Sequence, residues 1–180
     1  MSLYRRVIVG TCQSPGSIRA MRYARDLAAS SGAALITVHA WMPPGGEIAD
    51  RRAPNPILRQ VWQKAAWQRL NDSVEAAFGG QPDGVDVWPV VMRGAAGEVL
   101  VHVARNADDV LVVGAGRRGT LARLGHGQVV RHCLTHATCP VVAVPPSPLA
   151  GYARRWPRML AWRHHDLRAD EALDGADSNQ

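Results

Sequence analysis

Residues 6–40 read RVIVGTCQSPGSIRAMRYARDLAASSGAALITVHA and contain a strand, a helix and a second strand in succession. The run 6–10 is short, β-branched and closed by a glycine, which is typical of a buried strand. Ser17 is the predicted helix N-cap, and apolar residues then recur at helical spacing up to Gly32. Residues 34–40 form a second apolar run. This order predicts a parallel βαβ unit.

The chain up to residue 145 continues this alternation. Residues 110–114 (VLVVG) are apolar throughout, so we expect this strand at the centre of a sheet covered on both faces. The other predicted elements are an irregular connection over 41–56, a long amphipathic helix over 57–79, a strand over 85–92, a short helix over 98–106, a loop over 115–127, a helix over 129–136 and a strand over 140–144. The fold class is therefore α/β, a doubly wound five-stranded parallel sheet with helices on both faces. Ligands of such sheets bind beyond the carboxyl ends of the strands, here near Gly10 and Gly114.

The character of the sequence changes after residue 145, where Pro145, Pro146 and Pro148 form a stiff break. We predict a domain over residues 1–146 and a C-terminal extension over 147–180 that is flexible or loosely docked. The alternative is that apolar residues of this extension dock on a hydrophobic groove. Those residues are Trp156, Met159, Leu160 and Trp162.

Composition limits the classes of partner. The 180 residues are 47% hydrophobic, which is enough for one domain with a buried core. The net charge is +6, but the basic residues, nearly all Arg, are spread along the chain, so a nucleic-acid partner is not expected. Three cysteines without a C-x-x-C pair suggest a reducing compartment, and no apolar run is long enough to span a bilayer. We expect a cytoplasmic location and no membrane partner.

The glycines Gly114, Gly116 and Gly119 formally spell the G-x-G-x-x-G dinucleotide fingerprint. That fingerprint should follow the first strand of a βαβ unit, and it needs an acidic residue about twenty positions further on. Here it follows the fourth predicted strand, and residues 134–140 contain no Asp or Glu. We therefore reject a dinucleotide site of this kind.

A longer pattern accounts for this region better. Residues 108–144 contain a strand, Gly114, a glycine-rich loop to Gly127, a helix and the strand CPVVAV. This order resembles the C-terminal signature of universal stress proteins, and residues 6–17 and 38–41 resemble that family's opening and second strand. The resemblance spans about residues 5–145. It implies a Rossmann-like, adenine nucleotide alpha hydrolase-like fold.

The resemblance also implies a nucleotide site, of which this sequence keeps only a part. Gly114 and Gly127 match two glycines of the family's loop, and Val38 matches the strand position whose backbone faces adenine. The pocket should also be lined by Cys12, Arg117, Arg118 and Gln128. In nucleotide-binding members the positions of Cys12, Arg117 and Gln128 carry Asp, Gly, and Ser or Thr.

These departures from the motif weaken ATP binding through the backbone, because a Cβ at a left-handed position costs about 1–2 kcal/mol. Arg117 and Arg118 could instead pair with phosphate oxygens through their side chains. His132 and His136 lie four residues apart beside Cys133, but no third metal ligand is evident, so no metal site is predicted.

Our leading interpretation is a stress-response accessory or regulatory protein that acts by dimerisation and binding of an unidentified protein partner, with a degenerate nucleotide site, no cofactor and no enzymatic turnover. The resemblance implies a homodimer through the last strand, Val141–Val144. One alternative is an ATP- or AMP-binding stress sensor with at most slow ATP hydrolysis. The other is a nucleic-acid-associated protein that uses the Arg- and Trp-rich extension.

Overall fold

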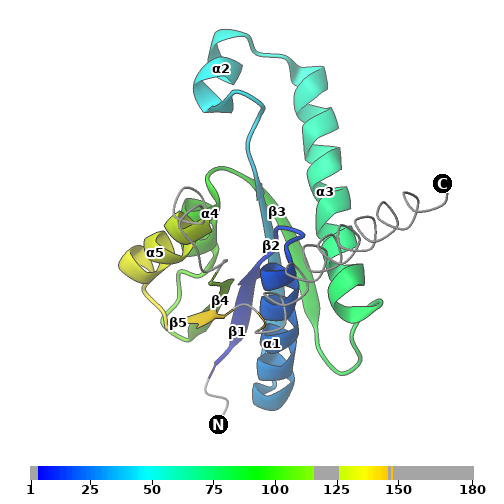
Figure 1. The fold of residues 1–180 in the computed structure, drawn as a ribbon, viewed down its shortest axis with the longest axis vertical. Coiled ribbons are helices and arrows are strands. Elements are labelled where there is room, and N and C mark those ends of the chain that lie inside the picture. The colour runs from blue at the N-terminus through cyan, green and yellow to red at the C-terminus, as the bar shows by residue number, and fades with distance from the viewer. Residues whose placement is uncertain (1–3, 116–125, 146, 148–180) are drawn as a thin grey trace, which may run out of the picture. The chain divides into compact units, whose positions relative to one another are not determined.

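A five-stranded parallel sheet with the strand order β3-β2-β1-β4-β5 forms the centre of the computed structural model, which describes residues 4–115, 126–145 and 147 (Figure 1). The strands are β1 (Arg6–Gly10), β2 (Ala34–Trp41), β3 (Val87–Arg93), β4 (Asp109–Gly114) and β5 (Val141–Val144). The helices are α1 (Pro15–Ser31), α2 (Gly46–Arg52), α3 (Pro56–Phe78), α4 (Ala96–Val103) and α5 (His126–His136). The predicted fold class is confirmed.

Side chains alternate between the two faces of the sheet and so divide the core into two layers. Val7, Val9 and Leu35 pack on the face that α1 and α3 cover. Ile8 and Val38 pack on the opposite face, under α4 and α5 (Figure 1). The first five residues of β4 are fully buried, as expected for a central strand with both faces covered.

A partly buried ion pair joins the starts of β1 and β4. The Arg6 guanidinium donates to both carboxylate oxygens of Asp109 at 2.8 and 2.6 Å, and Asp109 has no exposed surface. The backbone N–H of Asn106 donates to the same carboxylate at 3.0 Å. The hydrogen bond that Arg6 donates to Asp109 raises the pKa of Arg6. Arg6 and Asp109 are also Cα partners between β1 and β4, so the ion pair stabilises this register.

The main difference from the predicted elements is α2, in a segment that we expected to be irregular. Gly45 and Gly46 have φ values of 81° and 79°, which glycine adopts without strain, and they turn the chain into the helix. Ion pairs then hold α2 against Arg93 at the end of β3. These contacts join residues more than forty positions apart, so local sequence gives no sign of them. α4 and α5 also begin earlier than predicted, at Ala96 and His126.

The predicted boundary after residue 146 stays a prediction, because residues 148–180 lie outside the described residues. Across the described ranges, no helix is long and apolar enough to cross a bilayer.

Candidate functional site

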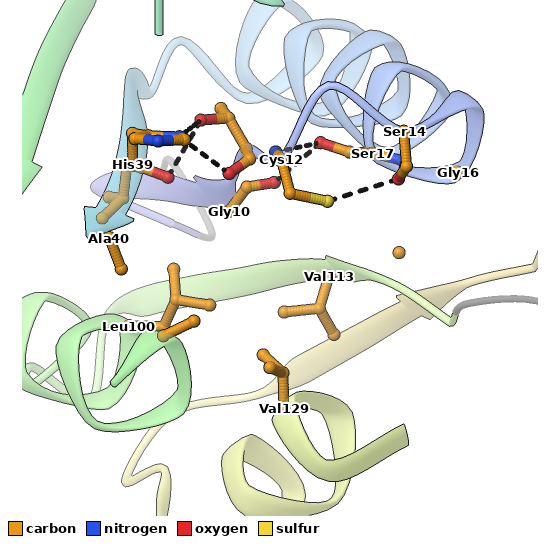
Figure 2. A pocket seen from close by; sticks show the side chains of 14 residues that line it. Gly10, Cys12, Ser14, Gly16, Ser17, His39, Ala40, Leu100, Val113 and Val129 are labelled. Atoms are coloured by element: carbon orange, nitrogen blue, oxygen red, sulfur yellow. Dashed lines mark hydrogen bonds between the residues drawn. The ribbon is translucent and has the colours of Figure 1, made fainter. Parts of the chain in front are cut away.

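A pocket of about 410 Å³ opens at the carboxyl ends of β1, β2 and β4 (Figure 2). In the sheet, β2 and β3 lie on one side of β1, and β4 and β5 lie on the other. The strand order therefore reverses at β1, and the pocket lies at this point. This is the predicted place. The described residues that line it are Gly10, Thr11, Cys12, Ser14, Gly16, Ser17, Val38, His39, Ala40, Ala96, Leu100, Val113, Gly114 and Val129.

One wall of the pocket is apolar. In Figure 2, Leu100 of α4, Val113 of β4 and Val129 of α5 approach the cavity from the side opposite the loop that joins β1 to α1. Val38 belongs to the same core layer and has 1% of its surface exposed. An apolar slot of this kind suits a planar ring, because aromatic and heterocyclic faces bury best against aliphatic side chains.

The opposite wall is the polar loop that leads into α1. Ser14, not the predicted Ser17, is the N-cap, and its hydroxyl accepts the backbone N–H of Ser17 at 3.1 Å. The Ser17 hydroxyl donates to the carbonyl of Gly10 at 3.3 Å and accepts the N–H of Cys12 at 3.0 Å. Ser17 therefore holds the loop, while Ser14 and the exposed Cys12 thiol, 3.3 Å apart, face the pocket (Figure 2).

Gly16 supplies a donor to this wall. Its N–H lies in the first turn of α1 and has no intrahelical acceptor, and a helix N-terminus favours negative charge. Gly114 lies directly against it. A Cβ on Gly114 would come within 2.9 Å of the Gly16 carbonyl oxygen, so the end of β4 and the start of α1 pack closely only because residue 114 is glycine.

Gln13 has a φ of 51°, the left-handed region that residues with a side chain rarely adopt. Its side-chain amide donates to Asp72 of α3 at 3.3 Å, which ties the loop to that helix. Strained backbone of this kind clusters at binding sites, where the surrounding structure holds it in place.

His39 is a buried histidine at the pocket that the sequence reading did not single out. Its Nδ1 lies 3.2 Å from both the carbonyl oxygen and the hydroxyl of Thr11. The carbonyl can only accept, so Nδ1 carries the proton. Burial lowers the pKa of His39, and the charge of Arg69 lowers it further. The ring is therefore neutral at pH 7. The one sequence signal was a histidine inside an otherwise apolar strand.

Comparison with known proteins identifies the domain. The model of the universal stress protein family matches residues 3–145. The chain belongs to the universal stress protein family. A universal stress protein of Mycobacterium tuberculosis is 30% identical over 149 residues, which covers 80% of this chain and 98% of that protein. A universal stress protein of Mycobacterium bovis is 28% identical over 151 residues, but this chain spans only 45% of its length.

Solved structures agree with this assignment. A universal stress protein in complex with cAMP is 28% identical, with a TM-score of 0.54 over 80% of this chain and 98% of that one. UspA from Lactobacillus plantarum gives a TM-score of 0.57 over 78% of this chain and 97% of that one. It is 18% identical, so it supports the fold alone.

The universal stress protein domain places three of the predicted site residues at the pocket, namely Cys12, Val38 and Gly114. Gly127 and Gln128 lie in the first turn of α5, exposed, and are not among the lining residues. Arg117 and Arg118 lie outside the described residues, so their roles stay predictions.

The backbone position that the resemblance gave to Val38 is already occupied in this domain. The Val38 carbonyl accepts the N–H of Thr11 at 2.8 Å, so Val38 offers the pocket only its side chain. Even-numbered residues of β2 direct their backbone groups toward β1, and Trp41 bonds to the β3 side instead. Ala40 therefore directs its N–H and C=O toward the pocket, beyond the last bond to β1, and it lines the cavity (Figure 2).

His132 and His136 lie on neighbouring turns of α5. His132 and His136 stack with ring centroids 4.2 Å apart, and His136 Nδ1 bonds the carbonyl of His132 at 2.9 Å. In the part of the chain that the structure describes, no three His, Cys, Asp or Glu side chains lie together as metal ligands would.

Proposed function

We propose that this stress-response protein binds an adenine mononucleotide in the pocket and acts as a regulatory protein by binding a protein partner, without turnover. Family membership gives the stress response itself. The observation that carries the nucleotide assignment is the pairing of Ala40's open backbone groups with the apolar slot. An N–H beside a C=O matches the acceptor and donor on one edge of adenine, and the slot takes the ring.

The polar wall fits the rest of such a ligand. The Gly16 N–H at the start of α1 is a donor for a phosphate oxygen, and the Ser14 hydroxyl lies beside it. The relative crystallised with cAMP supports the same chemical class, because it shares 28% of its residues with this chain. The pocket volume lies within the range of sites that enclose small ligands.

The lining side chains favour binding without turnover. Among those that the structure describes there is no carboxylate, and the one imidazole, His39, lies next to Ala40, where we place adenine, and not beside Gly16, where we place the phosphate. Efficient hydrolysis would need a base positioned at a phosphate.

The test is calorimetric titration of the chain with AMP, cAMP and Mg-ATP. We expect binding of at least one of them, and loss of it in Ala96→Trp, which places an indole from an exposed lining position into the slot. Ala49→Trp, an exposed site on α2, is the matched control. If none of the three nucleotides binds at millimolar concentration, the proposal fails.

We also propose that two copies pair through β5. β5 is an edge strand of four residues, and its even-numbered residues bond to β4, since the carbonyls of Pro140 and Val144 accept from Leu111 and Ala115. Ala143 therefore directs its N–H to the open edge, and its side chain is exposed. An unblocked edge of this kind accepts another strand.

A further inference from the structure

The outer face of α2 and of the first half of α3 carries large aliphatic side chains in contact with solvent. Ile48 is 69% exposed, Ile57 73%, Leu58 43% and Val61 55%. We call these four residues the α2–α3 surface. Both helices rise beyond the carboxyl edge of the sheet (Figure 1), so the sheet does not cover this face. Arg59 of α3 bonds to Asp50 of α2, so the two helices are neighbours, and exposed apolar residues gathered on neighbouring elements mark an interaction site.

The carboxylates of α2 are paired with arginines. Arg93 donates to Glu47 at 2.8 and 2.6 Å and to the buried Asp50 at 2.6 Å. Arg59 donates to Asp50 at 2.9 Å. The hydrogen bond from Arg59 lowers the pKa of Asp50, and that from Arg93 lowers the pKa of Glu47. Both carboxylates are thus neutralised by arginines of the same chain, while the aliphatic side chains face solvent.

Cations surround the apolar residues. Arg51 and Arg52 end α2, and Lys64 follows Ile57 and Val61 on the same face of α3, at helical spacing. All three side chains are exposed, and none takes part in a salt bridge within the described ranges. The surface is therefore an apolar stripe with a positive border.

We infer that the α2–α3 surface docks an acidic amphipathic helix of a partner protein. Ile57 and Val61 are one helical turn apart, which matches the spacing of apolar side chains along a partner helix. Carboxylates on either side of that partner's stripe would meet Arg51, Arg52 and Lys64. Charge complementarity of this kind selects the partner and speeds its association.

Two other occupants fit less well. Gln60 and Gln68 are exposed next to the stripe, and a bilayer interior would leave their amides without partners. A second copy would bring the same cations against one another. Dimerisation through β5 would also leave this surface free, because α3 packs on β2 and β3 at the other end of the sheet.

This inference rests on the partner-binding part of the proposed function and not on the pocket. The test is fluorescence anisotropy of a synthetic peptide with leucines on one helical face and glutamates elsewhere, titrated with the full chain. We expect saturable binding that weakens about tenfold or more in the double variant Ile57→Ser, Val61→Ser. Arg52→Ser with Lys64→Ser should weaken binding and reduce its salt dependence. Trp88→Ser, an exposed apolar residue of β3, is the control and should bind normally.

Several results would overturn the inference. They are no binding of the glutamate peptide, equal binding of a matched peptide with lysines, or unchanged binding by the Ile57/Val61 variant. If the protein sediments with phosphatidylserine vesicles and does not bind the peptide, the surface binds a bilayer instead. A change of oligomeric state in the Ile57/Val61 variant would assign it to a second copy. Calorimetric titration of the same variant with nucleotide should give the wild-type result, so the pocket and the surface fail independently.

Discussion

The two edges of the sheet are built differently. In β3 the even-numbered residues bond to β2, since the carbonyl of Asp86 accepts from Leu35 and the N–H of Gly94 donates to Trp41. Pro89 therefore occupies an outward position, where its lack of an N–H interrupts the row of donors. In β5 the outward position is Ala143, whose N–H is intact. One edge resists strand addition and the other permits it.

This asymmetry bears on assembly. A chain with two open edges would add copies at both ends and form an open filament, whereas one open edge closes after a single symmetric pairing. One open edge therefore fits the proposed dimer and not a filament.

The largest effect should come from breaking the connection that places β4, and with it β5, in the sheet. Asp109→Ala removes a fully buried carboxylate and leaves Arg6 without its partner, so the free energy of unfolding should fall by about 3 kcal/mol. Urea unfolding followed by circular dichroism measures this. Asp108→Ala, an exposed neighbour, is the control. A loss as small as the control's would show that the pair does not stabilise the sheet.

Ala143→Pro should convert the proposed dimer to a monomer. The substitution removes an outward N–H and leaves the bonds to β4 in place, so the stability of the monomer should change by less than about 1 kcal/mol. Light scattering across a concentration series reads the oligomeric state. A dimer that survives the substitution would place the interface elsewhere.

Pro89→Ala is the reciprocal change and should open the β3 edge. The variant gains an outward N–H and should form larger species at high concentration, detectable by sedimentation velocity. The double variant Pro89→Ala, Ala143→Pro distinguishes the two edges. Its β5 edge is blocked and its β3 edge is open, so it should form dimers through β3. If Pro89→Ala sediments as wild type does, exposed neighbours such as Trp88 already protect this edge.

The two sides of the domain should also lose stability at opposite ends of the pH range. The first side is represented by His39 on β2 and the second by Cys133 on α5. His39 on β2 has a lowered pKa in the folded state, so the unfolded chain binds more protons below its ordinary value of 6.5. Stability from this residue is present above that pH and is lost as the pH falls. His39→Gln should flatten the acid side of the stability profile measured by urea unfolding. An unchanged acid slope would mean that other groups control it.

On the β5 side, burial raises the pKa of Cys133 from 9.0 to about 11. The folded chain then holds a proton that the unfolded chain releases, so stability is lost as the pH rises from 9 toward 11. Cys133→Ala should remove this alkaline loss, although it lowers stability at neutral pH by leaving a small cavity. An alkaline slope equal to that of wild type would contradict the assignment.

The smallest effect concerns Cys12, in the loop that follows β1. Cys12 is exposed, whereas Cys133 and Cys139 are buried, so one thiol of the folded chain should react quickly with a maleimide. A nucleotide in the pocket should slow that reaction, because Cys12 lines the cavity. Mass spectrometry of the labelled peptides measures both effects. Equal labelling of all three cysteines would contradict the described burial.

The sequence predicted the sheet and the place of the pocket because both depend on local pattern. Apolar runs closed by Gly10 and Gly114 mark strands wherever they occur, and the connection rules then order them. Three of the predicted site residues, Cys12, Val38 and Gly114, do line the cavity.

The features that the sequence did not reveal depend on distant contacts. α2 needs Arg93, and the position of His39 needs Thr11 from the neighbouring strand. The opening at Ala40 arises because β1 pairs with β2 only as far as Val38, whereas β3 pairs with β2 as far as Trp41. The sequence of β2 alone does not show this difference. The N-cap is Ser14 and not Ser17, because the helix already begins at Pro15 and Ser17 lies in its first turn.

Gly114 carries a consequence for how this motif is used in evolution. Its missing side chain is required by the Gly16 carbonyl of the same chain, whether or not any ligand is present. A lineage that ceased to bind nucleotide would still keep this glycine, while positions 12, 117 and 128 drifted. A glycine at residue 114 therefore indicates that the fold is kept, not that a nucleotide is bound. The open backbone groups of Ala40 are the better guide to nucleotide binding.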